Sequence, residues 1–138
     1  MFQRTLFQLV RLSLARRNLV VLHGGLGRKQ RDAAFGSLSA IPDGEERLII
    51  STGRFIGEGF DDPRLDTMFL ALPVSWKGTL VQYAGRIHRL YPGKSEVRIY
   101  DYVDRSASML ARMFEKRLRG YNSLGYAKID ELGKKDGE

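Results

Sequence analysis

The sequence contains no cysteine and only two histidines. The lack of cysteine excludes a disulfide framework and a cysteine-ligated metal, and two histidines cannot form a metal site by themselves. No apolar run approaches the roughly 18 residues that a membrane span requires. We therefore expect a soluble protein with no metal site and no membrane partner. The absence of cysteine weakly favours a reducing compartment, and we expect a cytoplasmic location.

Acidic residues are the scarcer charged type, because 16 Asp and Glu stand against 23 Lys and Arg, which gives a formal net charge of +7 at pH 7. A basic surface favours polyanionic partners, since each neutralised phosphate releases bound counterions. We expect the partner to be DNA, with RNA as the alternative. The length of 138 residues fits one domain with one sizeable core.

The first 18 residues (MFQRTLFQLVRLSLARRN) contain no acidic residue. An arginine-rich amphipathic stretch of this kind is typical of a mitochondrial transit peptide, and it also fits a basic first helix. We favour the helix, whose apolar side chains would pack on the domain: Phe2, Leu6, Leu9 and Val10. At the other end, residues 133–138 have almost nothing apolar to bury, so this tail is predicted to be disordered.

Short apolar segments rich in β-branched residues predict four strands, at residues 19–23, 47–52, 67–72 and 97–103. Three further segments predict helices, at residues 28–38, 79–90 and 106–119. Ser106 is a candidate cap for the last helix. Strands that are apolar on both faces and mostly separated by helices predict a parallel sheet with helical crossovers. The fold class is therefore α/β.

Two glycine-containing segments resemble nucleotide-binding motifs but lack essential parts of them. Residues 93–95 (GKS) match the end of a phosphate-binding P-loop, yet His88 occupies the place of its first glycine. The segment also follows a helix and precedes a strand, the reverse of the required order, so we predict a turn. Residues 25–27 (GLG) match the start of a dinucleotide fingerprint, but Gln30 stands where close helix packing needs a third glycine. A dinucleotide-dependent enzyme is therefore disfavoured.

Residues 82–89 (QYAGRIHR) carry the strongest candidate for chemistry. On the predicted helix, spacings of four and three place Gln82, Arg86 and Arg89 on one face. An apolar stripe lies on another face and consists of Tyr83, Ile87 and Leu90. Two arginines one turn apart suit the charge that develops on a transferring phosphate, which is the task of an arginine finger. The alternative is an ordinary solvated basic helix face.

Several segments occur in the order of the motifs of superfamily-two helicases. Residues 51–63 (STGRFIGEGFDDP) resemble motif V, residues 82–89 resemble motif VI, and His23-Gly24 with Arg31 resembles the upstream HG element and the arginine after it. The resemblance covers residues 19–120. Within the superfamily, the sequence is similar to bacterial helicases related to type III restriction motor subunits and to the eukaryotic nucleotide-excision-repair translocase. It implies the C-terminal motor domain of an ATP-dependent DNA helicase or translocase, built on a RecA-like parallel sheet flanked by helices.

The resemblance also implies roles for individual residues. Two catalytic residues, Arg86 and Arg89, would act as arginine fingers on the γ-phosphate of ATP held by the first motor domain. Three residues would lie near the nucleotide: Gln82, Gly59 and Asp61. Three would contact the nucleic-acid backbone: Thr52, Gly24 and Arg31. Without the resemblance, an aspartate in a turn and a hydroxyl at a strand end have purely local interpretations.

The sequence lacks the P-loop and the acidic Walker B pair of a complete motor. ATP with Mg²⁺ would therefore be bound mainly by a first motor domain that this chain does not contain, and the chain is not expected to hydrolyse ATP alone. We expect a P-loop RecA-like domain as partner, in cis or in trans. The expected organisation is a divergent or truncated N-terminal helix (1–18), the RecA-like domain (19–120) and a partly disordered extension (121–138). The alternative is a non-catalytic remnant that binds nucleic acid or protein.

Overall fold

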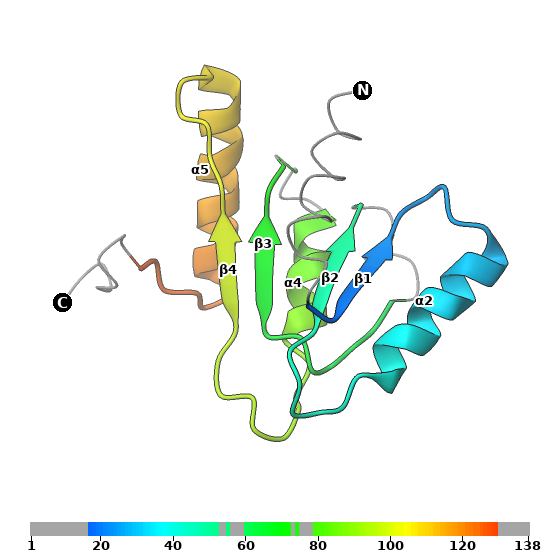
Figure 1. The fold of residues 1–138 in the computed structure, drawn as a ribbon. Helices are drawn as coiled ribbons and strands as arrows, with labels where there is room; N and C mark the ends of the chain where they lie inside the picture. The colour runs from blue at the N-terminus through cyan, green and yellow to red at the C-terminus, as the bar shows by residue number, and fades with distance from the viewer. Residues whose placement is uncertain (1–16, 53–54, 56–59, 73, 75–78, 130–138) are drawn as a thin grey trace. The chain divides into compact units, whose positions relative to one another are not determined.

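The computed structural model describes residues 17–52, 55, 60–72, 74 and 79–129 (Figure 1). The chain divides into two compact units, Met1–Asp61 and Asp62–Glu138, and each is described by itself. Each unit contains one pair of hydrogen-bonded parallel strands. Within the described ranges, no helix is long and apolar enough to cross a membrane.

The first unit is a strand–helix–strand arrangement: β1 (Leu19–Leu22), α2 (Arg28–Ala40) and β2 (Leu48–Ser51). The strands are parallel, with Leu19 opposite Leu48, because the helix returns the chain to the starting end of the pair. Val20 and Leu22 are buried and alternate with half-exposed neighbours along β1, as expected for a strand with one well-covered face. The buried apolar side chains of this unit are Val20, Leu22, Leu38, Ile41 and Phe60.

Local hydrogen bonds fix both ends of α2. At its start, the side-chain oxygen of Gln30 accepts a hydrogen bond of 3.0 Å from the Gly27 N–H, a donor that the helix itself leaves unpaired. The residue that replaces the third glycine of a dinucleotide fingerprint therefore caps a helix. After its end, the Arg47 guanidinium donates to the carbonyl of Pro42 at 2.9 Å. This bond holds the predicted turn at residues 42–44 immediately before β2.

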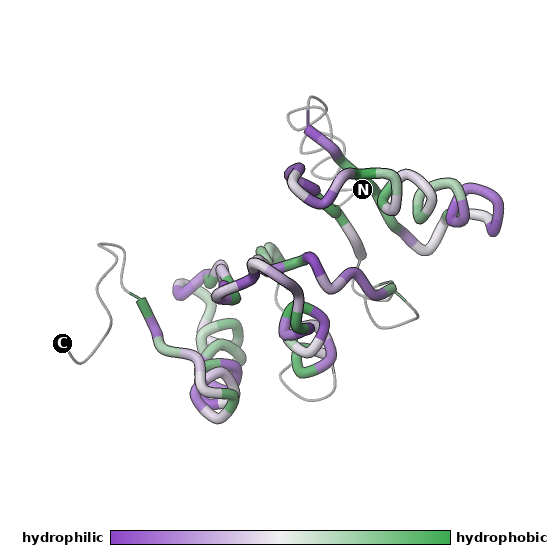
Figure 2. The backbone as a smooth tube through the Cα atoms, turned by 90° about the horizontal axis from the view of Figure 1, so that it is seen from below, coloured by the Kyte–Doolittle hydropathy of each residue, from purple (hydrophilic) through white to green (hydrophobic). Residues whose placement is uncertain are grey.

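The described residues of the second unit form two strands and two helices: β3 (Thr67–Leu70), α4 (Val81–Ile87), β4 (Arg98–Asp101) and α5 (Ser108–Ser123). The strands are parallel, with Thr67 opposite Arg98. Both helices lie on the same side of this strand pair (Figure 2). The core between them is formed by the buried side chains of Leu70, Leu80, Tyr83, Ala84, Ile87 and Tyr121.

A buried ion pair attaches α5 to β4. The guanidinium of Arg117, only 1% exposed, donates to both carboxylate oxygens of Asp101, at 2.7 and 2.9 Å, and to the carbonyl of Val74 at 3.0 Å. The hydroxyl of Tyr121 donates to the same carboxylate at 2.9 Å. Burial raises the pKa of Tyr121, and the neighbouring charge of Asp101 raises it further. This bidentate geometry fixes the angle of the helix as well as its distance from the strand.

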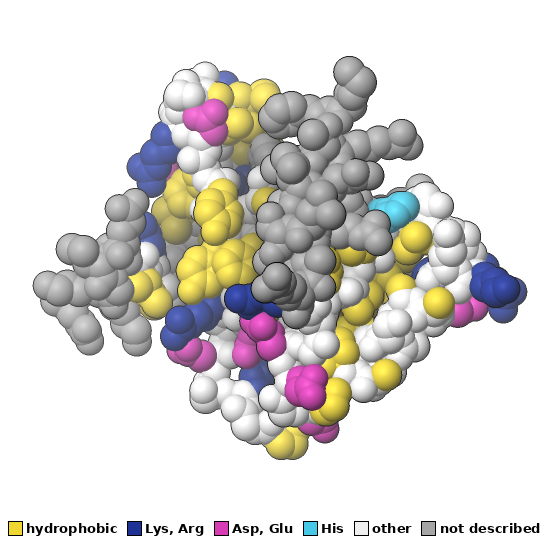
Figure 3. Space-filling view, viewed as in Figure 1, with side chains coloured by type: hydrophobic (Ala, Val, Ile, Leu, Met, Phe, Trp, Pro, Cys, Tyr) yellow, Lys and Arg dark blue, Asp and Glu magenta, His cyan; other side chains and the backbone are white. Residues whose placement is uncertain are grey.

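The opposite face of β3 and β4 carries exposed aromatic side chains. Phe69 and Tyr100 are opposite one another in the register, and their rings stack with centroids 4.8 Å apart and planes at 8°. Their exposed fractions are 56% and 43%, and that of Tyr102, next on the same face, is 60%. Figure 3 shows hydrophobic side chains gathered over this face, which neither helix of the second unit covers. The pair of strands is thus covered unequally by its own unit.

The structure confirms the α/β class and all four strands and three helices expected within the described residues, but it corrects two local predictions. Helix α4 ends at Ile87 and not at Leu90, whose side chain is 96% exposed and takes no part in the apolar stripe. Ser106 does not cap α5, which begins at Ser108 after Ala107. The N–H and hydroxyl of Ser106 instead donate to the carboxylate of Asp104, and these bonds lower the pKa of that carboxyl. A local turn therefore competes successfully with the cap.

Candidate nucleotide and nucleic-acid site

The three predicted nucleic-acid contacts lie within the first unit. The Thr52 N–H donates to the Leu22 carbonyl at 3.1 Å, which extends the β1–β2 ladder to the carboxyl ends of both strands. Gly24 follows β1 by two residues, so it lies at the same edge as Thr52. Both residues are exposed. Exposed backbone and hydroxyl groups at the carboxyl edge of parallel strands are available to an external ligand.

The segment around Gly24 is arranged by its own backbone. The Leu26 N–H donates to the His23 carbonyl at 3.0 Å, and the Gly25 N–H donates to Nδ1 of the same histidine at 3.2 Å. Apart from its chain neighbours, no heavy atom of the described residues lies within 4 Å of a Cβ added at Gly24. The described part of the chain therefore leaves space above Gly24.

Arg31 belongs to the first turns of α2 and is exposed. Its guanidinium carbon lies 5.6 Å from the ring centroid of Phe55, three residues beyond Thr52. One turn further along the helix, the ring of Phe35 stacks on Phe60 with centroids 6.3 Å apart. Sequence reasoning missed both aromatic contacts, because the sequence around Phe55 and Phe60 has no apolar periodicity that marks them. They connect Arg31 to the segment that follows β2.

The three residues predicted from the QYAGRIHR segment lie in the second unit, but not all on one helix. Gln82 is exposed in the first turn of α4, and Arg86 is half-buried in its last turn. Arg89 lies after the helix end and is exposed. The prediction that all three share one helical face is therefore wrong for Arg89. The spacing of three residues between Arg86 and Arg89 would place both on one face only if the helix continued past Ile87.

Two contacts hold the segment around Arg89. Nε2 of His88 and the hydroxyl of Tyr126 are 2.6 Å apart, and their rings meet edge to face. Burial raises the pKa of Tyr126 to about 12. The second contact is made by Lys94, whose ammonium donates to the carbonyl of Arg89 at 2.7 Å and to that of Pro63 at 3.2 Å. Neither contact was found from the sequence, since no motif marks them.

The residues predicted near the nucleotide are described only in part. Gly59 lies outside the described residues. Asp61 is exposed and ends the first unit, whereas Gln82 belongs to the second. The next residue, Asp62, is 4% exposed, and its carboxylate accepts hydrogen bonds from the backbone and guanidinium of Arg64 at 2.8 to 3.1 Å. Of these two consecutive aspartates, Asp62 thus has a local structural role.

The chain is an α/β domain of the RecA-like type, with parallel strands linked by helices. Residues 2–91 match the family described as Helicase conserved C-terminal domain, and the chain belongs to this family. Members of the family work with nucleic acids and with an N-terminal motor domain. The chain is also similar to Uncharacterized protein 108L of Invertebrate iridescent virus 3, with 38% identity over 86 residues, 60% of this chain and 75% of the viral protein.

Proposed function

We propose that this chain is the C-terminal motor domain of an ATP-dependent DNA helicase or translocase and works with a P-loop RecA-like domain in cis or in trans. Within the helicase family, its motifs favour the group of type III restriction motor subunits and excision-repair translocases. The observation that carries the proposal is the edge of the first unit, where the Thr52–Leu22 hydrogen bond brings two helicase motifs together. We further propose a cytoplasmic location, in agreement with the absence of cysteine.

Gripping of the nucleic-acid backbone is the proposed task of Thr52, Gly24 and Arg31. A hydroxyl, exposed backbone groups and a guanidinium are all suited to phosphate oxygens, and none of them requires a particular base. The formal net charge of +7 adds attraction for any nucleic acid. DNA is the proposed partner, and RNA is an outcome that a binding comparison would reveal. The grip is therefore expected to be independent of sequence.

ATP with Mg²⁺ is the proposed nucleotide, bound mainly by the P-loop partner. Arg86 and Arg89 supply cationic donors for phosphate oxygens, and the Gln82 amide is a neutral donor nearby on α4. Guanidinium groups are not ligands for Mg²⁺, so the partner would hold the metal. When bound, ATP supplies the phosphoryl group whose transfer drives the motor. The arginines stabilise the charge that develops on that group, while Asp61 and Gly59 would lie near the nucleotide.

A partner in trans is compatible with the length of the viral relative. The 86 aligned residues make up 75% of that protein, which is therefore shorter than this chain. A protein of that length has room for one domain of this kind and not for two.

A second candidate is a non-catalytic module that only holds nucleic acid or another protein. The first unit favours it in one respect, because Thr52, Gly24 and Arg31 all belong to that unit. Such a module would bind nucleic acid and would gain nothing from a P-loop partner. The two candidates therefore differ in ATP hydrolysis and not in binding.

The decisive experiment measures DNA-stimulated ATP hydrolysis by this chain alone and after mixing with a cognate P-loop domain. We expect hydrolysis only in the mixture. Arg86→Ala and Arg89→Ala should each lower its kcat by a factor on the order of 10³ while sparing DNA binding. Arg112→Ala, an exposed arginine of α5, is the matched control and should leave kcat unchanged. Persistent hydrolysis in both finger variants contradicts the assignment, and an inactive native mixture favours the binding module.

A further inference from the structure

Lys94 connects two segments that lie next to the residues with a proposed role at the nucleotide. Its ammonium donates to the carbonyl of Arg89 at 2.7 Å and to the carbonyl of Pro63 at 3.2 Å. Pro63 is the last residue of the motif V segment, and Arg89 is the last arginine of motif VI. All three residues belong to the second unit, in which their arrangement is described. One side chain therefore connects the end of one motif to the end of the other.

We propose that Lys94 is a positioning residue that fixes the main chain of Arg89, and thereby the direction of its guanidinium, relative to the Asp62–Arg64 turn. The proposal rests on the proposed function, in which Arg89 is an arginine finger. Lys94 touches neither nucleotide nor nucleic acid in this role. It acts only through the backbone carbonyls that it bridges.

The need for such a bridge follows from the early end of α4. The last intrahelical bond of this segment runs from the His88 N–H to the Ala84 carbonyl at 3.1 Å. Arg89 lies one residue further, beyond the end of the helix. A guanidinium at the end of a long side chain moves with every rotation of its backbone. A charge-assisted hydrogen bond to the Arg89 carbonyl restricts that rotation at its source.

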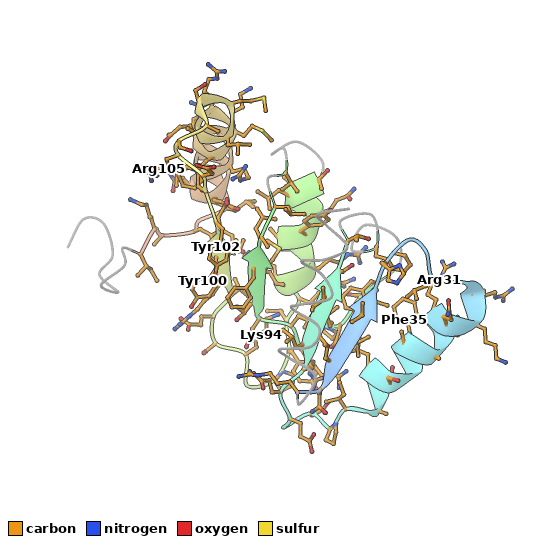
Figure 4. The ribbon with its side chains drawn as sticks, turned by 45° about the horizontal axis from the view of Figure 1, so that its top comes forward. Arg31, Phe35, Lys94, Tyr100, Tyr102 and Arg105 are labelled. Carbon is orange, nitrogen blue, oxygen red and sulfur yellow. The ribbon has the colours of Figure 1, made fainter. Side chains whose placement is uncertain are left out.

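The turn before β4 delivers the lysine to this position. The Lys94 N–H donates to the Tyr91 carbonyl at 3.1 Å, and Gly93 between them has a φ of +83°, which a residue with a Cβ adopts only with strain. The GKS segment thus returns the side chain toward the end of α4 (Figure 4). Its lysine is engaged by protein carbonyls, which is a different task from that of a P-loop lysine.

The surroundings of the ammonium suit a structural bridge. Burial lowers the pKa of Lys94, while the carboxylates of Asp66 and Asp62 act in the opposite direction. Asp62 is itself bound by Arg64 in the same turn. The ammonium is thus partly withdrawn from water and lies between two carbonyls and two acidic residues. The free-energy cost of ordering a side chain in this position is lower than that of ordering a fully hydrated surface lysine.

The test compares Lys94→Met, which keeps the stem and removes the charge, with Lys94→Arg, which keeps donors, and with Lys116→Met on the exposed face of α5 as control. The first measurement is the carbonyl ¹³C chemical shift of Pro63 and Arg89 in the full chain. The second is ATP hydrolysis in the mixture with the P-loop domain. We expect Lys94→Met to move both carbonyl shifts and to lower kcat by a factor on the order of 10 to 100, with the KM for DNA unchanged. Lys94→Arg should recover part of kcat, and Lys116→Met should change nothing.

Carbonyl shifts that stay in place in Lys94→Met overturn the bridge itself. A kcat in this variant within a factor of about two of the Lys116→Met control overturns the positioning role. If Lys94→Met fails to fold, Lys94→Gln decides, because its shorter, uncharged side chain should not bridge the two carbonyls, and a kcat and carbonyl shifts at the native values would overturn the proposal. An inactive native mixture overturns the proposed function and the positioning role together, and it is recognised as such because every variant is then equally inactive.

Discussion

At the scale of single residues, the contact between His88 and Tyr126 couples the end of α4 to the segment after α5. The Tyr126 N–H donates to the Tyr121 carbonyl at 3.1 Å, and Gly125 before it has a φ of +85°. This left-handed glycine ends α5 and returns the chain, as glycine commonly does after a helix. The turn places the Tyr126 hydroxyl 2.6 Å from the imidazole. Tyr126, which lies 38 residues after His88 in the sequence, thereby supports the segment that carries Arg86 and Arg89.

The raised pKa of Tyr126 predicts a loss of stability at high pH. Burial raises this pKa to about 12, above the ordinary value near 10. The unfolded chain therefore releases the phenolic proton first, so the contribution is complete below pH 10 and is lost as the pH rises through about 12. Tyr126→Phe should show a shallower fall of unfolding free energy between pH 10 and 12. Urea unfolding at several pH values measures this slope.

Tyr102→Phe is the matched control for that experiment, since its hydroxyl lies on a side chain that is 60% exposed. We expect this variant to keep the fall in unfolding free energy that Tyr126 causes between pH 10 and 12. Identical slopes in Tyr126→Phe and the native protein would show that the phenol ionises normally in the folded state.

At the scale of elements, the strands and helices follow from sequence pattern, while their exact ends depend on local contacts. Apolar β-branched runs correctly predicted β1 to β4, because burial on a parallel sheet demands such residues. The pattern continued past Ile87 and suggested a helix through Leu90. The chain leaves the helix there and enters the Tyr91–Lys94 turn, and the ammonium of Lys94 binds the released carbonyl of Arg89. No local rule reveals a hydrogen bond donated from five residues further along.

Gly93 is the residue on which this turn depends, and a substitution measures its contribution. Gly93→Ala should lower the free energy of unfolding by about 1–2 kcal/mol, the ordinary cost of a left-handed φ for a residue with a Cβ. Apart from its chain neighbours, the new Cβ would meet no heavy atom of the described residues within 4 Å, so the cost comes from the backbone conformation. Denaturant unfolding monitored by circular dichroism checks the value.

A substitution that is expected to raise the free energy of unfolding, and not to lower it, provides the control. Gly36 lies within α2 at an exposed position. Apart from its chain neighbours and the nearby backbone of α2, a Cβ there also meets no heavy atom of the described residues within 4 Å. Gly36→Ala should raise the free energy of unfolding by about 0.5–1 kcal/mol, because glycine has the lower helix propensity. Equal effects of the two alanines would refute the argument from the φ of Gly93.

At the scale of the whole molecule, two units divide the proposed work. The first contains the edge with Gly24, Arg31 and Thr52, and the second contains Gln82, Arg86 and Arg89. The sequence predicted the two groups through the order of their motifs. It did not predict the contacts that support them, such as Arg31 on Phe55 or Lys94 on Arg89, because no motif or periodicity marks these pairs. The roles of the motif residues themselves remain predictions for experiment.

The net charge of +7 makes the salt dependence of binding the most direct measure of the proposed edge. Each lost phosphate contact should reduce the slope of log K against log salt concentration by roughly 0.7–0.9. Arg31→Ala should produce such a reduction and weaken binding equally for DNA of any sequence. Thr52→Val should weaken binding several-fold without changing the slope, because it removes a neutral hydroxyl. Titration of labelled DNA at four salt concentrations provides both quantities.

Arg112→Ala removes the same charge from an exposed position on α5 and separates a specific contact from the general attraction of a basic protein. If the edge of the first unit grips phosphate, Arg31→Ala changes the slope and the control does not. If the two arginine variants behave alike, binding arises from net charge alone, since the field of a basic surface does not distinguish between its sources. In that case, Thr52→Val would also bind like the native protein, and the motif V edge would have no part in nucleic-acid binding.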